Sequence, residues 1–286
     1  MPIELINVDY AYEGQTGDPV VALEGVSLRI DDGEFVGIMG HTGCGKTTLI
    51  QMIAGLKEPA RGEILLDGLD INGPKYDRRL LREKVGIVFQ YPEYQLFETS
   101  VERDVAFGLK HSGLDGAEIV QRTKWALETM AFSYEDIRRK SPLSLSGGEK
   151  RRVAIAGVLV TQPKVLMFDE PIAGLDPKNR ELFLQVVSRL QREGTTIIMV
   201  SHNVDALGEY AKRLIVMDHG RKVMDGSVTE VFSDLDRLKA SGLRPCAPRA
   251  LADMLAARGV SLPEGIVSYG ALLEGIAAYA REGGAP

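Results

Sequence analysis

The segment that most constrains the fold of this chain runs from Gly40 to Thr47 and has the sequence Gly-His-Thr-Gly-Cys-Gly-Lys-Thr. An apolar run at 35–39, typical of a buried strand, precedes it, and a segment with helical apolar spacing, 48–56, follows it. A strand, a loop of the pattern G-x-x-x-x-G-K-[ST] and a helix in this order predict a phosphate-binding loop. The glycines let the backbone approach phosphates, and the helix N-terminus supplies N–H donors.

Within this loop, Lys46 is expected to reach the β- and γ-phosphates of a nucleotide and Thr47 to bind Mg²⁺. A glycine-rich turn without a ligand is the structural alternative, and the strand and helix around the loop argue against it. The residues predicted to contact the nucleotide here are Gly40, His41, Thr42, Gly43, Cys44, Gly45, Lys46, Thr47 and Thr48.

Two consecutive carboxylates end a second apolar segment, Val-Leu-Met-Phe-Asp-Glu at 165–170. Taken alone, such a pair is usually a solvated strand end. Because a phosphate-binding loop lies upstream, we instead expect Asp169 to hold Mg²⁺, directly or through water. Glu170 would then face the γ-phosphate, where a carboxylate can orient or deprotonate the attacking water.

Apolar strand patterns alternate with helical patterns along most of the chain, as the βαβ units of a parallel sheet require. We therefore predict an α/β fold. Its buried strands are expected at 35–39, 85–89, 165–168 and 196–200, with an edge hairpin at 214–225.

Two additions to this core are predicted. Segments 3–12 and 20–30 alternate with period two around a turn-rich stretch and should form an antiparallel β subdomain. Residues between the strands at 85–89 and 165–168 have mainly helical patterns and predict an inserted α-helical subdomain at about 92–163. Its helices are expected at 101–109, 117–129 and 148–160.

The chain has 34 basic and 40 acidic residues and a net charge of −6. This balance provides no general attraction to nucleic acid or anionic lipid. The best apolar run, 153–160, is much shorter than the about 20 residues of a transmembrane helix, and the N-terminus lacks a secretory-signal pattern. Two cysteines, Cys44 and Cys246, argue against a disulfide framework. We expect a cytosolic protein that reaches a membrane only through a protein partner.

The segment Leu-Ser-Gly-Gly-Glu at 145–149 opens a predicted helix. The Ser146 hydroxyl, the N–H groups of Gly147 and Gly148 and the helix dipole suit a γ-phosphate. This segment resembles the signature sequence of ATP-binding-cassette (ABC) proteins, which other phosphate-loop ATPases lack. The resemblance implies a phosphate-loop NTPase (RecA-like) core, with ATP and Mg²⁺ bound.

The resemblance also implies roles for residues outside these three segments. Gln90 resembles the Q-loop glutamine that senses Mg²⁺ and the γ-phosphate, and it joins Thr47 and Asp169 as a predicted metal ligand. Asp176 resembles the D-loop aspartate at the dimer contact, and His202 resembles the switch histidine that contacts the γ-phosphate. Tyr12 resembles the aromatic residue that stacks on adenine, with Tyr10 as the neighbouring alternative. The implied catalytic set is Glu170, His202, Gln90 and Lys46.

Three segments narrow the resemblance: Gly-His-Thr-Gly at 40–43, the nine residues 89–97, and Arg-Arg-Val-Ala-Ile-Ala-Gly at 151–157. They are similar to the ATPase subunits of energy-coupling-factor transporters, which import vitamins and cobalt or nickel in prokaryotes. Two positions depart from that pattern, Ile172 where threonine is usual and Cys44 where serine is commoner. Neither departure removes a catalytic group.

The narrower resemblance implies several partners. A second ABC ATPase subunit, either a copy of this chain or a paralogue, would pair head to tail with it, so that each ATP lies between two subunits. A transmembrane coupling subunit and a substrate-binding membrane subunit would hold the pair at the cytoplasmic face of the cell membrane as a peripheral protein. The rival class is a soluble ABC ATPase acting on nucleic acid or ribosomes. A single cassette without a coiled coil or basic extension argues against that class and against a nucleic acid partner.

Two further expectations concern the tail and Cys44. The ABC ATPase domain is expected to span 1–232, and residues 233–286 to form an accessory extension with helices at 250–258 and 269–281. The tail is similar to the C-terminal extension of the energy-coupling-factor ATPases, and this resemblance implies that it helps the two ATPase subunits to pair. Cys44 lies beside Lys46 and backbone N–H groups, which should lower the pKa of the thiol and make it reactive. A buried, inert replacement for serine is the alternative. Cys246 is expected to be accessible to thiol reagents.

Overall fold

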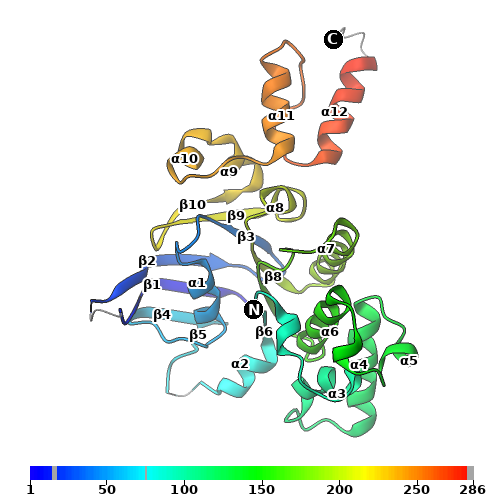
Figure 1. Cartoon of the computed structure of the whole chain (residues 1–286). Helices are drawn as coiled ribbons and strands as arrows, with labels where there is room; N and C mark the ends of the chain where they lie inside the picture. Colours follow the sequence, from blue (N-terminus) through cyan, green and yellow to red (C-terminus); the bar gives the residue numbers. More distant parts are fainter. Residues whose placement is uncertain (15–17, 75, 282–286) are drawn as a thin grey trace.

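The computed structural model describes residues 1–14, 18–74 and 76–281 and contains two β-sheets and the helices that cover them (Figure 1). The larger sheet has the strand order β10-β9-β3-β8-β7-β6. All its neighbouring strands are parallel except β10, which pairs antiparallel with β9. Its strands are β3 (Phe35–Met39), β6 (Val85–Val88), β7 (Val165–Asp169), β8 (Thr196–Val200), β9 (Arg213–Asp218) and β10 (Arg221–Ser227). The predicted α/β class is confirmed.

The smaller sheet is antiparallel and has the order β2-β1-β4-β5. The predicted hairpin is present, because Ile3 pairs with Ile30 and Tyr12 with Val20. Part of the turn predicted between these strands, 15–17, lies outside the described residues. The sequence patterns did not predict the last two strands of this sheet, of which one has only two residues and the other begins with three exposed residues. The four strands are β1 (Ile3–Tyr12), β2 (Val20–Ile30), β4 (Arg61–Leu66) and β5 (Leu69–Asp70).

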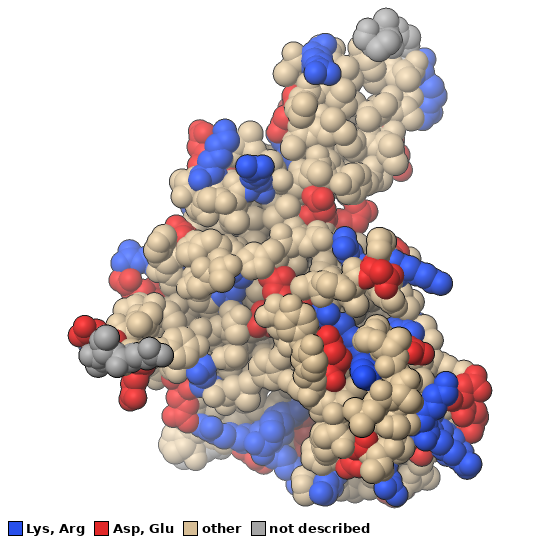
Figure 2. All heavy atoms as spheres, viewed as in Figure 1, with Lys and Arg blue, Asp and Glu red and all other residues tan. Residues whose placement is uncertain are grey.

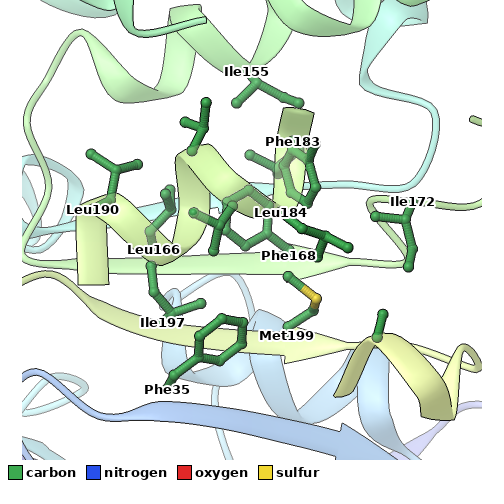
Figure 3. Close-up of a cluster of buried hydrophobic side chains, with 14 of the residues drawn as sticks. Phe35, Ile155, Leu166, Phe168, Ile172, Phe183, Leu184, Leu190, Ile197 and Met199 are labelled. Carbon is green, nitrogen blue, oxygen red and sulfur yellow. The ribbon is translucent and has the colours of Figure 1, made fainter. Parts of the chain in front are cut away.

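Successive residues of the parallel strands enter two different cores, because side chains alternate between the faces of a strand. On β7, Val165 and Met167 pack with the smaller sheet and α1 (Lys46–Ile53), whereas Leu166 and Phe168 pack with helices on the opposite face. Figure 3 shows the second core, with Phe168 facing Phe183 of α7 (Pro177–Arg192). Their ring centroids are 5.1 Å apart and nearly perpendicular. Both faces of the sheet are thus covered by a hydrophobic core.

Helices fill the chain between β6 and β7, as predicted. The predicted helix over 101–109 ends earlier, and 107–109 forms a 3₁₀ turn in which Gly108 lies against the backbone of Gly157. The helices of this segment are α3 (Val101–Ala106), α4 (Gly116–Thr129), α5 (Tyr134–Ile137) and α6 (Gly147–Leu159). The short helices elsewhere are α2 (Arg78–Lys84), α8 (Val204–Tyr210), α9 (Val228–Ser233) and α10 (Leu235–Ala240).

The two C-terminal helices, α11 (Ala247–Ala256) and α12 (Tyr269–Arg281), project from the body (Figure 1). The first begins three residues before the predicted start because Pro248 suits the first turn of a helix. Hydrogen bonds to α8 hold the pair in place: the Ala247 N–H donates to the Asp205 carboxylate at 2.7 Å and the Tyr269 N–H to Glu209 at 3.1 Å. Among the described residues, no helix is both long and apolar enough to span a membrane.

Candidate functional site

The predicted functional segments meet at one edge of the larger sheet. The glycine loop follows β3, His202 follows β8, Asp169 and Glu170 end β7, and Gln90 follows β6. Since β3, β8, β7 and β6 are neighbours and parallel, their carboxyl ends lie side by side. This edge is where ligands bind in open α/β sheets.

The glycine loop has a backbone that only glycine tolerates at key positions. Gly45 has φ +103°, and a Cβ there would lie 2.3 Å from the Ala22 carbonyl oxygen. The Lys46 ammonium group donates hydrogen bonds to the carbonyl oxygens of Gly40 and His41, both at 2.8 Å. The loop is therefore wrapped around the lysine head group at the start of α1, a cradle of N–H donors and positive charge suited to phosphates.

Thr47 and Asp169 supply neighbouring oxygen atoms. The Thr47 hydroxyl donates to Asp169 Oδ2 at 2.8 Å across the 122 residues that separate them. Burial raises the pKa of Asp169, although the hydrogen bond from Thr47 and the charge of Lys46 oppose that shift. A hydroxyl and a carboxylate oxygen fit Mg²⁺, which prefers oxygen ligands. Gln90 is exposed at the end of the next strand, and its amide has no hydrogen-bond partner among the described residues.

Glu170 and His202 face each other beside this pair. The Glu170 side chain is only 13% exposed, and its Oε1 lies 3.4 Å from His202 Nε2. Its Oε2 accepts a hydrogen bond from the His202 backbone N–H at 3.2 Å. Burial raises the pKa of Glu170. The backbone of Glu170 has φ +50°, a left-handed conformation that costs energy in a residue other than glycine and often accompanies a functional site.

Tyr12 lies over the start of α1. Its hydroxyl is 3.0 Å from the Thr48 hydroxyl, and 38% of its surface is exposed. Its ring meets that of Tyr10 edge to face, with centroids 5.0 Å apart, and Lys57 Nζ lies 4.7 Å from the Tyr12 centroid. Both tyrosines thus lie on one side of β1, as expected, and the geometry leaves Tyr12 and Tyr10 as neighbouring candidates for the adenine.

The signature segment lies apart from the phosphate loop. Ser146 is the N-cap of α6, and it forms a capping box with Glu149, whose carboxylate accepts from the Ser146 N–H at 2.9 Å and hydroxyl at 2.7 Å. Ser146 and Gly147 are exposed, and Gly148 is half-buried. Figure 1 shows α6 among the helices between β6 and β7, away from α1. The signature segment is therefore exposed and does not complete the phosphate site of its own chain.

The predictions for the two cysteines are wrong. Cys44 is fully buried, and burial raises the pKa of its thiol in spite of Lys46 Nζ at 3.7 Å. Cys246 is also fully buried, donates to the Val267 carbonyl oxygen at 3.3 Å, and has its pKa raised to about 11 by burial. Desolvation disfavours a thiolate more than nearby positive charge favours it. The alternative of a small, inert residue in place of serine is the one that fits Cys44.

Arg151 was not among the predicted site residues. Its guanidinium is buried and donates to the carbonyl oxygens of Ala173 at 2.8 Å and Glu170 at 3.2 Å. It thus ties α6 to the backbone of the acidic pair. The two arginines that follow Lys150 after the signature are a weak sequence signal, because both are the same residue type and only Arg151 reaches this site.

Comparison with known proteins agrees with this geometry. The ABC transporter family profile matches residues 23–173. The energy-coupling factor transporter ATP-binding protein EcfA2 of Symbiobacterium thermophilum is 47% identical over 268 residues, which cover 94% of this chain and 93% of the relative. CbiO1 from Clostridium perfringens, described as part of the ABC transporter complex cbiONQ, superposes with a TM-score of 0.72 at 39% identity, covering 88% of this chain and 98% of CbiO1.

A second solved structure is the ATP-binding cassette MJ0796, a dimer in a post-hydrolysis state with ADP and Pi. It superposes with a TM-score of 0.69 at 30% identity and covers 79% of this chain and 98% of its own. The family binds ATP, and these similarities favour a transporter ATPase over a soluble ABC ATPase acting on nucleic acid or ribosomes. The chain is an ABC ATPase and belongs to the ATP-binding subunits of energy-coupling factor transporters.

Proposed function

We propose that this ATPase powers the uptake of a micronutrient, either a vitamin or a transition metal ion, through separate membrane subunits. The observation that carries the proposal is the separation of two half-sites on one chain. Lys46, Thr47, Asp169 and Glu170 gather at the sheet edge, whereas Ser146 lies on α6. Because neither half can surround a nucleotide alone, a complete site needs two subunits, as the dimeric form of MJ0796 supports.

In this proposal each residue has a defined task. Lys46 and the loop N–H groups hold the β- and γ-phosphates, and Tyr12 stacks on adenine. Thr47 and Asp169 would hold Mg²⁺, with Gln90 reaching it from β6, and the ion would neutralise charge on the phosphates. Glu170 orients the attacking water, and His202 contacts the γ-phosphate. The buried position of Glu170, with its raised pKa, suits a group that accepts a proton.

The partner subunit is a copy of this chain or a paralogue, placed head to tail. In this proposal residues 1–232 form the ATPase domain and residues 233–286 the extension that assists pairing, of which 282–286 lie outside the described residues. Several large apolar side chains are exposed on α11 and α12, including Met254 at 58% and Leu273 at 65%. Figure 2 shows mostly uncharged atoms over these two helices on the face in view. Exposed apolar surface of this kind is typical of protein contacts.

A membrane coupling subunit would contact the surface just after Gln90. Four aromatic side chains are exposed there, among them Tyr94 at 85% and Phe97 at 63%, and the Phe97 ring meets Phe107 edge to face at 4.9 Å. Exposed aromatic groups are enriched in interface hot spots. A contact beside Gln90 would connect the γ-phosphate site to the membrane. A separate substrate-binding membrane subunit would select the cargo, and the ATPase pair would lie at the cytoplasmic face.

Figure 2 shows acidic and basic side chains interspersed over most of the face in view. Figure 2 also shows a blue area near the place of α2. Within α2, Arg79 forms an ion pair with Glu83 at 3.1 Å. With a net charge of −6, this surface supports a protein partner rather than nucleic acid.

Affinity purification of the tagged chain from detergent-solubilised native membranes tests this function. We expect a membrane coupling protein and a small substrate-binding membrane protein to co-purify with it. Phe97→Glu should lose both, because a charge on the aromatic surface opposes docking. Leu69→Glu is the matched control, since Leu69 is also 63% exposed and lies on β5. Recovery of ribosomes or nucleic acid in place of membrane proteins would refute the proposal.

A further inference from the structure

Three side chains of ligand type gather on the far side of β3 from Glu170. His41 belongs to the phosphate loop, while Asp218 ends β9 and His219 begins the turn to β10. His41 Nε2 and His219 Nδ1 each lie 2.8 Å from Asp218 Oδ1. One ligand atom from each residue falls within 4.8 Å of the others. The proposed roles of the nucleotide site do not use the Asp218 and His219 side chains.

A neutral His41 ring carries one N–H and therefore cannot donate a hydrogen bond to both of the oxygen atoms that face its two nitrogens. Its Nδ1 lies 2.8 Å from the Thr42 carbonyl oxygen, which can only accept a hydrogen bond. With the proton on Nδ1, the Nε2 lone pair points at the Asp218 carboxylate, which also accepts only. The ring therefore needs a second proton, or a cation between Nε2 and the carboxylate. A metal ion satisfies both lone pairs, and the Thr42 carbonyl then fixes the correct tautomer.

The backbone holds the third ligand in place. His219 has φ +44° and Gly220 φ +77°, the left-handed pair of a tight hairpin turn that favours Asn, Asp or Gly at the first position. A histidine in this left-handed conformation is energetically less favourable than glycine or asparagine. The Gly220 N–H also donates to the Cys44 carbonyl oxygen at 3.1 Å, which ties this turn to the phosphate loop. The two imidazole rings are thereby kept 5.0 Å apart.

We propose that His41, Asp218 and His219 form a site for a divalent transition-metal ion such as Zn²⁺ or Co²⁺. Two imidazoles and a carboxylate are ligands that such ions take, with a fourth position left for water. Bonds of about 2.0–2.2 Å place tetrahedral ligand atoms about 3.3 Å apart, so the 2.8 Å contacts must open by about 0.5 Å. The His219 side chain is 84% exposed and free to make that adjustment. A bound ion would clamp the phosphate loop to the β9–β10 turn.

Titration of the full-length, metal-free protein with Co²⁺ tests the site without any use of ATPase activity. Visible absorption and calorimetry should report one tightly bound ion. Asp218→Asn and His219→Asn should each weaken binding by more than the about 10–100-fold that loss of an outer hydrogen-bond partner costs. Asparagine suits the positive φ at position 219, so this variant should fold. His111→Ala is the control, because His111 lies outside the cluster and should leave binding unchanged.

Competition with Mg²⁺ and a variant of the nucleotide site distinguish the proposed metal site from the nucleotide site. Mg²⁺ in excess should not displace Co²⁺, because imidazole ligands disfavour a hard ion. Displacement by Mg²⁺, or loss of binding in His202→Ala with full binding in His219→Asn, would place the ion at the nucleotide site and overturn the proposal. Unchanged affinity in both Asp218→Asn and His219→Asn would overturn it as well.

Discussion

At the residue scale, Glu170 is a buried ionisable group that the proposed chemistry needs. Because burial raises the pKa of Glu170, its ionised form is disfavoured in the folded protein. The stabilising effect of this raised pKa is present at low pH and is lost as the pH rises through the folded-state value. Ionisation of Glu170 therefore lowers the free energy of unfolding.

The substitution Glu170→Gln should lower ATP turnover by about 10²–10⁴-fold, the usual contribution of a general base. ATP binding should remain, since Lys46 and the loop are unchanged, whereas Lys46→Ala should lose binding. Above the folded-state pKa of Glu170 the glutamine variant should melt at a higher temperature than the wild type, and the difference should shrink as the pH falls through that pKa. Turnover assays with the assembled transporter and thermal melts check both effects. Near wild-type turnover in the glutamine variant would show that Glu170 does not orient the attacking water.

Burial of both thiols leads to a second residue-scale prediction. Maleimide should label native Cys44 and Cys246 slowly, with or without Mg-ATP, because each side chain is fully buried and its pKa is raised. Both should label rapidly in denaturant. Peptide mapping by mass spectrometry measures the two rates. If Cys44 labels rapidly in the native protein and ATP prevents the labelling, Cys44 is the reactive thiol that the sequence predicted.

At the scale of secondary-structure elements, Arg151 connects α6 to the backbone after β7. Loss of its guanidinium would leave the carbonyl oxygens of Glu170 and Ala173 without these hydrogen bonds. Arg151→Ala should lower the free energy of unfolding by about 1–3 kcal/mol, the cost of unsatisfied buried polar groups. Turnover should fall too, because the Glu170 backbone loses support. Lys150→Ala on the same helix is the control, and equal destabilisation by both variants in urea melts would contradict the assignment.

At the scale of the whole molecule, the separation of the two half-sites predicts that two inactive variants restore activity when they are mixed. A Lys46→Ala chain retains its Ser146 signature, and a Ser146→Arg chain retains its phosphate loop. A mixed dimer therefore contains one intact composite site, whereas each variant alone contains none. Some ATPase activity should return on mixing if the chain pairs with itself. Inactivity of mixed dimers shown to form would mean that one intact site is insufficient, and failure to form them would favour a paralogue as partner.

The tail allows a separate test of pairing. Leu273→Glu places a charge on the exposed face of α12 and should shift the monomer–dimer equilibrium towards monomer by about tenfold or more, the effect of losing a hot-spot contact. Sedimentation velocity in the presence of ATP measures the shift. Leu69→Glu is the control, because Leu69 has a similar exposed fraction, 63% against 65%. An unchanged equilibrium in Leu273→Glu would assign pairing to the ATPase domain alone.

The sequence by itself determined the class of fold and the order of its parts, because these depend on local signals. A glycine loop between a strand and a helix, an acidic pair after an apolar run, and period-two segments before them were all readable along the chain. The helix over 269–281 was predicted to the residue. Which strands are neighbours was not readable along the chain, and the observed order brings Lys46, Asp169, His202 and Gln90 to one edge. Short exposed strands such as β5 carry too little pattern to be predicted.

Only the tertiary structure decided which groups lose water and which distant residues meet. The environment of Cys44 depends on the packing of β3, α1 and the β9–β10 turn around it, so the nearby Lys46 was a misleading guide to its pKa. Arg151 and Arg152 are neighbours of the same type, and the path of the backbone after β7 selects the first for the site. His41 and Asp218 are 177 residues apart, and their contact exists only because β9 pairs with β3. Burial and long-range pairing are properties of the folded chain, and no local pattern encodes them.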